Sequence, residues 1–154
     1  MRYYTHVAGG IMAGMLVSAH IPPADFLNVA VSAACALLPD VDTTDSFAGR
    51  RIKPVSFVAG LTGHRKIFHS LWPVFLILLF LPGPLKYYAA AGYFSHLLLD
   101  AMTPGSVPWL WPLPYRWGLR LIPTGSMIEK LIVLPVLVIG IAKLIIPAGI
   151  PFVH

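Results

Sequence analysis

Apolar residues are concentrated in five long runs along this chain. They cover residues 6–21, 26–38, 67–81, 87–102 and 128–146, and proline, glycine or charged residues interrupt the chain around each run. Such interruptions mark helix boundaries, so the pattern predicts five helices embedded in a membrane. Several runs are shorter than the roughly 20 residues that cross a bilayer comfortably, and we expect some helices to tilt or to enter the membrane only partly.

The composition supports a membrane protein. Of 154 residues, 57% are hydrophobic and only 11% are charged, whereas soluble domains carry roughly 25% charged residues. The chain has no internal repeat and no low-complexity segment, which predicts a single domain over residues 1–154. We expect the first run to be retained as a helix rather than cleaved as a signal peptide, because a second run follows almost at once. The predicted fold is therefore an all-α, polytopic membrane helical bundle.

The charge distribution favours a lipid surface as partner and gives no reason to expect nucleic acid. The net charge is +5, but the basic residues flank the apolar runs instead of forming a soluble basic face. Alternating spans place most of these residues on the side that holds the N-terminus. By the positive-inside rule this side is cytoplasmic.

Alternating membrane spans also place the potential metal ligands on the side of the membrane that holds the N-terminus. His96 and Asp100 are the strongest pair, because a spacing of four residues puts both side chains on one helix face. An isolated pair of this kind is often just a neutral histidine bonded to a carboxylate. Within an apolar run, with other polar groups predicted nearby, a shared divalent ion is the better interpretation.

Two carboxylates, Asp40 and Asp42, follow the second run, where Pro39 helps to end the helix. Alternate carboxylates around a turn can direct oxygens at one or two cations, although aspartate is also common in exposed turns. The topology favours Asp40 and Asp42 as ligands.

The segment before the third run contains His64, Arg65 and His69. A loop-to-helix junction fits the five-residue spacing of the two histidines better than a continuous helix. Imidazole is the commonest metal-binding side chain, and Arg65 offers a planar fork for a phosphate. A basic interfacial anchor is the alternative. His6, at the start of the first run, completes the predicted set.

Two segments after the fourth run also carry recognisable patterns. Residues 103–117 are dense in proline and aromatic residues, which predicts an interfacial loop between the fourth and fifth helices that forms a lid or platform beside the site. A passive aromatic belt would explain this loop almost as well. Ser126 and Glu129 have the spacing of a capping box, which would account for Glu129 without a role in catalysis.

With these motifs the chain resembles the YdjM-like bacterial inner-membrane proteins, a family described as metal-dependent hydrolases. The match covers most of the chain and rests on His6, the Leu-Pro-Asp-x-Asp of 38–42, the His-Arg-x-x-x-His of 64–69, the His-x-x-x-Asp of 96–100, Thr103, Gly105, and residues 110–112 and 124–126. The resemblance implies a bacterial inner-membrane location.

The motif order is also remotely similar to the zinc-dependent phospholipase C and single-strand nuclease superfamily, which implies a phosphate-ester substrate. The chain departs from that pattern because it lacks a second late His-x-x-x-Asp. One or two metal ions are therefore expected instead of a three-metal cluster.

The ligand set itself predicts the chemistry. Mixed histidine and carboxylate ligands suit zinc, or manganese if carboxylates dominate, and such an ion activates water for hydrolysis. We expect the metal ligands to be His6, Asp40, Asp42, His69, His96 and Asp100. Asp42 would otherwise act as general base, His64 as ligand or proton donor, and Arg65 as a clamp for negative charge.

The predicted function is hydrolysis of a phosphate ester in a lipid or lipid-linked substrate. A transporter of divalent metal ions, or one coupled to protons, is one alternative, and it predicts ligands spread through the membrane depth. A second alternative is a non-catalytic scaffold stabilised by a metal that protein ligands enclose completely.

Overall fold

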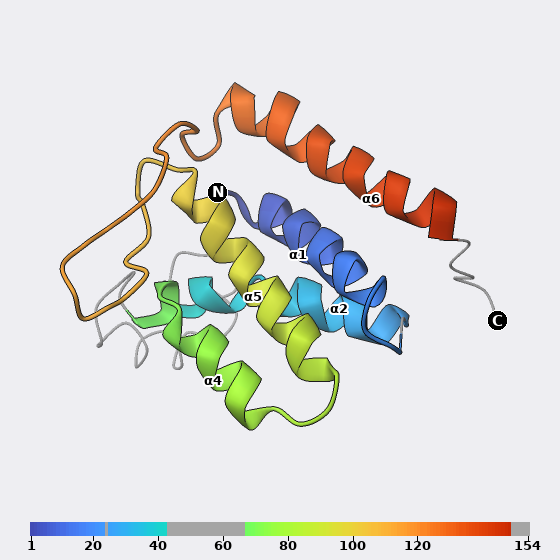
Figure 1. Ribbon diagram of the computed structural model, residues 1–154. Coiled ribbons are helices and arrows are strands. Elements are labelled where there is room, and N and C mark those ends of the chain that lie inside the picture. The colour runs from blue at the N-terminus through green and yellow to red at the C-terminus, as the bar shows by residue number, and fades with distance from the viewer. Residues whose placement is uncertain (24, 43–66, 149–154) are drawn as a thin grey trace.

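The computed structural model describes residues 1–23, 25–42 and 67–148, which form helices joined by turns and loops (Figure 1). Within these ranges the only strand-like pairing is an isolated bridge between Val107 and Trp117. The prediction of an all-helical fold is therefore confirmed for the described part of the chain. The elements in chain order are α1 (Tyr3–Ser18), α2 (Phe26–Cys35), η1 (Leu38–Asp42), η2 (Ile67–His69), α4 (Trp72–Phe80), α5 (Leu85–Ala101), η3 (Glu129–Val133) and α6 (Leu134–Ala148).

Each predicted run contains one α-helix, but three of the runs are divided. In the fifth run, the π-helical η3 precedes α6. The second run leaves the α conformation after Cys35 and continues as the 3-10 turn η1, because Pro39 lacks an N–H and disfavours the α conformation in the residue before it. The third run begins with the 3-10 turn η2, and α4 starts only at Trp72, with Pro73 in its first turn. Over the ranges that the structure describes, no helix combines the length and the apolar character needed to cross a membrane.

Small residues allow α1, α2 and α5 to cross closely around Ser32. A Cβ atom on Gly92 of α5 would overlap the Ser32 carbonyl group, and one on Gly14 of α1 would lie 2.8 Å from Ser32 Cβ. Ser32 is fully buried, and its hydroxyl donates a hydrogen bond of 2.8 Å to the Gly10 carbonyl oxygen. The small residues thus let these helices approach closely, and the crossing sets the position of the site.

The remaining helices pack outside this crossing. In Figure 1, α6 lies along α1, while α4 lies beside α5. The α1–α5–α6 side is held by a buried apolar cluster formed by Met1, Ala8, Leu99, Ile122, Val133 and Leu137. A second cluster of Tyr93, Leu97 and Val107 lies between α5, α4 and the loop that follows α5.

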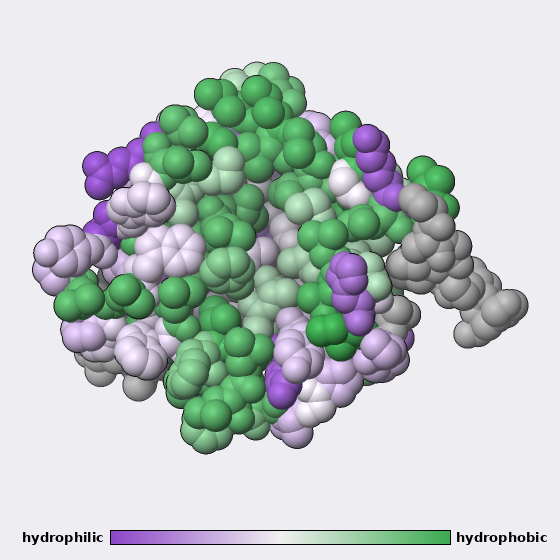
Figure 2. Space-filling model, in the orientation of Figure 1, coloured by the Kyte–Doolittle hydropathy of each residue, from purple (hydrophilic) through white to green (hydrophobic). Residues whose placement is uncertain are grey.

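Large apolar side chains are exposed on α4 and α6. Phe80 is 74% exposed and Ile146 is 80% exposed, and apolar surface covers much of the face seen in Figure 2. Soluble monomers rarely expose apolar patches of this extent. This surface is typical of a protein that contacts lipid or another protein.

Candidate metal centre

Five predicted ligands from four separate elements meet at one point. His6 lies in the first turn of α1, Asp40 in η1 and His69 at the end of η2, while His96 and Asp100 lie in the last turns of α5. The spacing of four residues puts His96 and Asp100 on one face of α5, as expected. The crossing of α1 and α2 with α5 brings His6 and Asp40 to that face, and η2, which packs against η1 and α4, brings His69.

The donor atoms are separated by distances that suit a shared metal ion. His96 Nε2 lies 3.8 Å from Asp40 Oδ1 and 3.6 Å from Asp100 Oδ2, and His69 Nε2 lies at the same two distances from these oxygens. His6 Nε2 lies 3.4 Å from Asp100 Oδ1. These separations are long for hydrogen bonds. Tetrahedral zinc with bonds of 2.0–2.1 Å has ligand atoms about 3.3–3.4 Å apart, so the cluster fits this geometry with only small adjustments.

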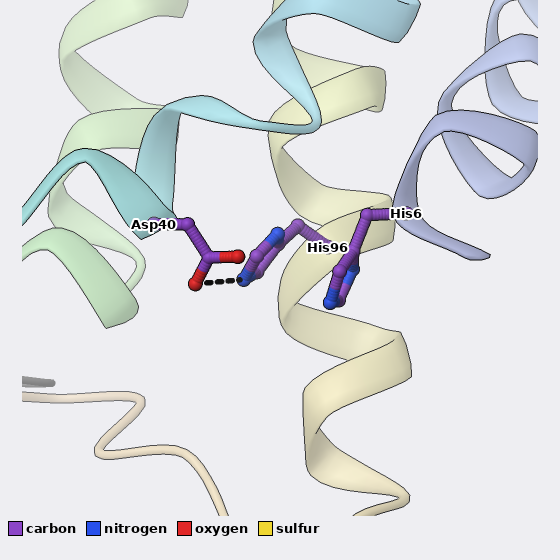
Figure 3. A group of neighbouring side chains, drawn as sticks. All are labelled: His6, Asp40 and His96. Carbon is purple, nitrogen blue, oxygen red and sulfur yellow. Dashed lines mark ion pairs between the residues drawn. The ribbon is translucent and has the colours of Figure 1, made fainter. Parts of the chain in front are cut away.

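The cluster forms two overlapping groups that meet the requirements of a metal site. One comprises His6, Asp40 and His96, and the other comprises His69, His96 and Asp100; within each group the donor atoms lie within 4.8 Å of one another. Figure 3 shows the His96 ring between the Asp40 carboxylate and the His6 ring. Because His96 belongs to both groups, they describe one centre.

The orientation of His96 is fixed by the backbone. Its Nδ1 atom lies 2.8 Å from the carbonyl oxygen of Ala36, so Nδ1 carries the proton and Nε2 is left to face the carboxylates. Metal-binding histidines are commonly oriented by such a contact. The His6 and His96 rings are stacked with their centres 3.8 Å apart.

Burial gives a further argument for a bound ion. Both ring nitrogens of His6 and the Nε2 atom of His96 are buried, and no hydrogen-bond partner for them lies among the described residues. Burying polar atoms in this way costs free energy unless they bind something. A cation held by these nitrogens would remove that cost.

The centre is more accessible on one side. The side chains of His6, His69, His96 and Asp100 are between 0% and 4% exposed, whereas the Asp40 side chain is 24% exposed. A molecule from outside would therefore approach past Asp40 and η1.

Several contacts that hold the predicted ligands in place could not be found from the sequence. The Tyr93 hydroxyl donates a hydrogen bond of 2.6 Å to the carbonyl oxygen of Phe68, next to His69, and the Thr103 hydroxyl donates one of 2.8 Å to the carbonyl oxygen of Asp100. The amino group of Met1 lies 2.6 Å from Asp100 Oδ1. These partners are backbone groups or single polar residues without a recognisable spacing, so sequence patterns could not identify them.

Three predicted catalytic residues are not placed by the structure. The backbone of Asp42 ends η1, but its side chain, together with His64 and Arg65, lies outside the described residues. Their roles stay predictions. The roles of the five gathered residues as metal ligands also stay predictions, although their proximity is established.

The structure describes both the aromatic loop after α5 and the predicted capping box of Ser126 and Glu129. In the aromatic loop, Tyr115 and Trp117 are 78% and 79% exposed, while the Trp111 carbonyl oxygen accepts a hydrogen bond of 2.6 Å from the Trp72 side chain. The capping box is only half formed: Glu129 N–H donates to Ser126 Oγ, but the Glu129 carboxylate accepts hydrogen bonds from other residues instead of reaching back to Ser126 N–H.

Comparisons with known proteins identify the family. The family model for the YdjM inner membrane protein matches residues 1–152. The inner membrane protein YdjM of Escherichia coli K12 and that of Shigella flexneri are each 37% identical to the chain over 126 residues, which cover 73% of this chain and 61% of each relative. The uncharacterized protein YvsG of Bacillus subtilis is 35% identical over 136 residues, covering 83% of this chain and 84% of the relative.

The chain thus spans about three fifths of the length of the two YdjM relatives, given by their 61% coverage. No solved structure matches it. The names of these relatives include no catalytic activity, metal or substrate. They do confirm the predicted location in the bacterial inner membrane. On the strength of the family match over residues 1–152, the chain belongs to the YdjM inner membrane protein family.

Proposed function

We propose that this protein is a metal-dependent hydrolase of the bacterial inner membrane. The observation that carries the proposal is the cluster of three histidines and two aspartates, drawn from four elements, with donor atoms 3.4–3.8 Å apart. Such a cluster is costly to bury without a cation. The Ala36 carbonyl oxygen also holds His96 with its Nε2 atom toward the carboxylates, an orientation that a chance pairing of polar residues would not need.

We further propose that the centre holds a single zinc ion, with manganese as the alternative. Both candidate ligand groups use His96, whose Nδ1 atom is committed to the Ala36 carbonyl oxygen. Only Nε2 is then available, and one nitrogen serves one ion. A bound ion would supply an activated water and would polarise the phosphoryl oxygen of a substrate.

The residues of the chain would divide the remaining work. Asp40, the most exposed member of the cluster, marks the side from which substrate enters. On this proposal Asp42 takes a proton from water, His64 donates one to the leaving group, and Arg65 binds the negative charge that develops on the phosphate. His6, Asp40, His69, His96 and Asp100 supply the ligands of the ion.

A lipid or lipid-linked phosphate is the substrate that fits the surroundings best. The protein belongs to an inner-membrane family, and α4 and α6 expose apolar side chains that suit contact with lipid chains. Exposed aromatic residues such as Tyr115 and Trp117 favour the headgroup layer. We propose that the helices are embedded in the membrane and that the centre faces the cytoplasmic headgroups.

A metal-stabilised scaffold is the second candidate. Five donors are enough to fill the four positions of a structural zinc site, and four of the five side chains are almost completely buried. A carrier is less well supported, because the described donors gather at one point instead of following a path through the molecule.

Metal analysis of the purified chain, combined with hydrolysis assays on phospholipids and polyprenyl phosphates, separates these functions. The hydrolase predicts about one zinc per chain and hydrolysis that is lost in Asp100→Ala and retained in His20→Ala, which changes an exposed histidine of the first predicted run. Zinc without turnover of any substrate would favour the scaffold. Transport of a divalent ion into liposomes, lost in Asp100→Ala, would favour the carrier.

A further inference from the structure

We infer that Glu129 is a positioning residue of the metal centre, and that its carboxylate fixes the turn of α1 that carries His6. The inference rests on the proposed function, because it concerns the same centre. It assigns a role to a buried carboxylate that lies outside the ligand cluster and that the sequence pattern explained only as a helix cap.

Glu129 is fully buried, and its carboxylate accepts three hydrogen bonds, two from the start of the chain and one from the turn just before Glu129. Oε1 accepts from the Arg2 backbone N–H and from the Thr5 hydroxyl, each at 2.7 Å, and Oε2 accepts from the Gly125 N–H at 2.5 Å. A buried carboxylate is tolerated only when it is satisfied in this manner. Both oxygens are therefore held in place, and Thr5 is fully buried beside them.

These contacts lead directly to His6. Arg2, whose N–H donates to Glu129, also accepts through its carbonyl oxygen the N–H groups of Thr5 at 3.0 Å and His6 at 3.3 Å. Arg2 provides no side-chain cap for α1. Glu129, 127 residues away, accepts the N–H of Arg2 itself, the bond that the glutamate of a capping box makes, and its negative charge suits the positive end of the helix.

His6 needs such support because it lies in the first turn of α1, and helix ends fray. Its ring must keep the stack on His96, with centres 3.8 Å apart, and the 3.4 Å separation between Nε2 and Asp100 Oδ1. Metal ligands work only when held within about 0.5 Å of the productive geometry. Loosening the first turn would therefore weaken metal binding even though no ligand had been removed.

A purely structural role is the competing explanation. Glu129 begins η3, which runs into α6, so its hydrogen bonds also join α6 to α1. Both explanations predict that loss of the carboxylate lowers stability. Only the positioning role predicts a change in the affinity and ligand geometry of the metal centre.

The test uses the full chain in detergent and the variant Glu129→Gln, which keeps the size of the side chain. A glutamine amide offers one accepting oxygen and one NH2 group, so at least one of the three donors would face another donor. We expect zinc affinity, measured by competition with a chelator, to fall about tenfold or more. The absorption spectrum of the cobalt-loaded variant should also differ from that of the wild type.

Thr5 provides a second, milder test. Thr5→Val keeps the shape of the side chain and removes one of the three donors, so we expect a smaller loss of zinc affinity than in Glu129→Gln. Thr5→Ser retains the hydroxyl and should restore binding close to the wild-type value. If Glu129→Gln does not fold, wild-type affinity in Thr5→Val overturns the inference.

Asp25 supplies the matched control. Its carboxylate caps α2 by accepting a hydrogen bond of 2.7 Å from the Asn28 N–H, and it has no contact with the cluster among the described residues. Asp25→Ala should lower the melting temperature and leave zinc affinity and the cobalt spectrum unchanged. The inference is overturned if Glu129→Gln behaves in the same way. If the wild-type chain binds neither zinc nor cobalt, the proposed function fails and the inference fails with it.

Discussion

At the scale of single residues, Asp100 is the carboxylate of the cluster that lies close to all three histidines. One of its oxygens lies 3.4 Å from His6 Nε2, and the other lies 3.6 Å from both His69 Nε2 and His96 Nε2. A negative charge among three imidazoles and the Met1 amino group compensates for the positive charge of a bound cation and its neighbours. Asp100 is therefore the residue on which metal binding should depend most strongly.

Replacing Asp100 by asparagine tests this dependence without changing the size of the side chain. The amide retains one weak oxygen ligand and loses the charge. Loss of a residue that only hydrogen-bonds to a metal ligand lowers metal affinity roughly 10–100-fold, and we expect a larger fall here. Isothermal titration with zinc measures the effect, and Asp25→Asn, at an exposed helix cap, is the control. Equal zinc affinity in the two variants would contradict the role given to Asp100.

The sequence pointed to the five gathered residues, although not to all of their supports. The His96–Asp100 pair follows from helical spacing, and His6, Asp40 and His69 follow from where the apolar runs begin and end. The Ala36 carbonyl oxygen and the Glu129 hydrogen bonds could not be predicted, because a backbone acceptor has no residue-type signature and a contact over 127 residues has no local spacing.

At the scale of helices, the close crossing of α1, α2 and α5 determines the geometry of the centre. Gly10 faces Ala36 so closely that a Cβ atom added to this glycine would lie only 2.7 Å from the Ala36 Cβ atom, and the carbonyl oxygen of Ala36 orients His96. Gly92 lies one turn before His96 on α5. The small residues of the packing surface therefore act on the site through the backbone.

Gly92→Ala should disturb this crossing. The added Cβ would overlap the Ser32 carbonyl group, which is backbone and cannot rotate away. We expect a loss of about 1–3 kcal/mol in the free energy of unfolding.

Gly140→Ala on α6 is the control, since its Cβ would meet only the flexible side chain of Met12. Chemical unfolding followed by circular dichroism measures the stability of both variants. Equal stability would contradict the close contact between Gly92 and the Ser32 carbonyl group.

Tyr93→Phe tests the attachment of η2 to α5. Loss of the hydroxyl removes the hydrogen bond of 2.6 Å to the partly buried Phe68 carbonyl oxygen and should cost about 0.5–1.5 kcal/mol. Zinc affinity should fall as well, since His69 follows Phe68. Tyr87→Phe, at a 41% exposed position of the same helix, should have little effect on either the unfolding free energy or the zinc affinity. Unchanged zinc affinity in Tyr93→Phe would mean that this hydrogen bond does not help to place His69.

The helix order was predictable from the apolar runs, whereas the interruptions were harder to place. Pro39 marked the end of the second helix, but the 3-10 turn at η2 depends on Ser70, whose hydroxyl donates to the Ile67 carbonyl oxygen at 2.6 Å and accepts from Trp72 N–H at 3.3 Å. A single serine in an apolar run carries little signal. Element boundaries of this kind are set by local side-chain hydrogen bonds.

At the scale of the whole molecule, one ion would join four elements that are distant in sequence. His6, Asp40, His69 and Asp100 come from α1, η1, η2 and α5. A ligand that binds only where all of them meet stabilises the folded state over the unfolded chain. Metal content and thermal stability should therefore be linked.

Zinc should raise the melting temperature of the purified chain. At about 100 times the dissociation constant, binding adds about 2.7 kcal/mol, which corresponds to roughly 5–10 °C for a chain of this size. Magnesium, which prefers oxygen ligands in octahedral geometry, should have a much smaller effect. Differential scanning fluorimetry measures both. An equal shift with zinc in wild type and Asp100→Asn would place the stabilising ion elsewhere.

X-ray absorption at the zinc edge of the loaded protein examines the shared metal centre most directly. We expect a first shell of nitrogen and oxygen at about 2.0–2.1 Å, with the scattering signature of two or three imidazoles. The imidazole scattering should be weaker in His96→Ala and unchanged in His20→Ala. A shell with at most one imidazole, or the same spectrum in His96→Ala, would contradict a centre formed by His6, Asp40, His69, His96 and Asp100.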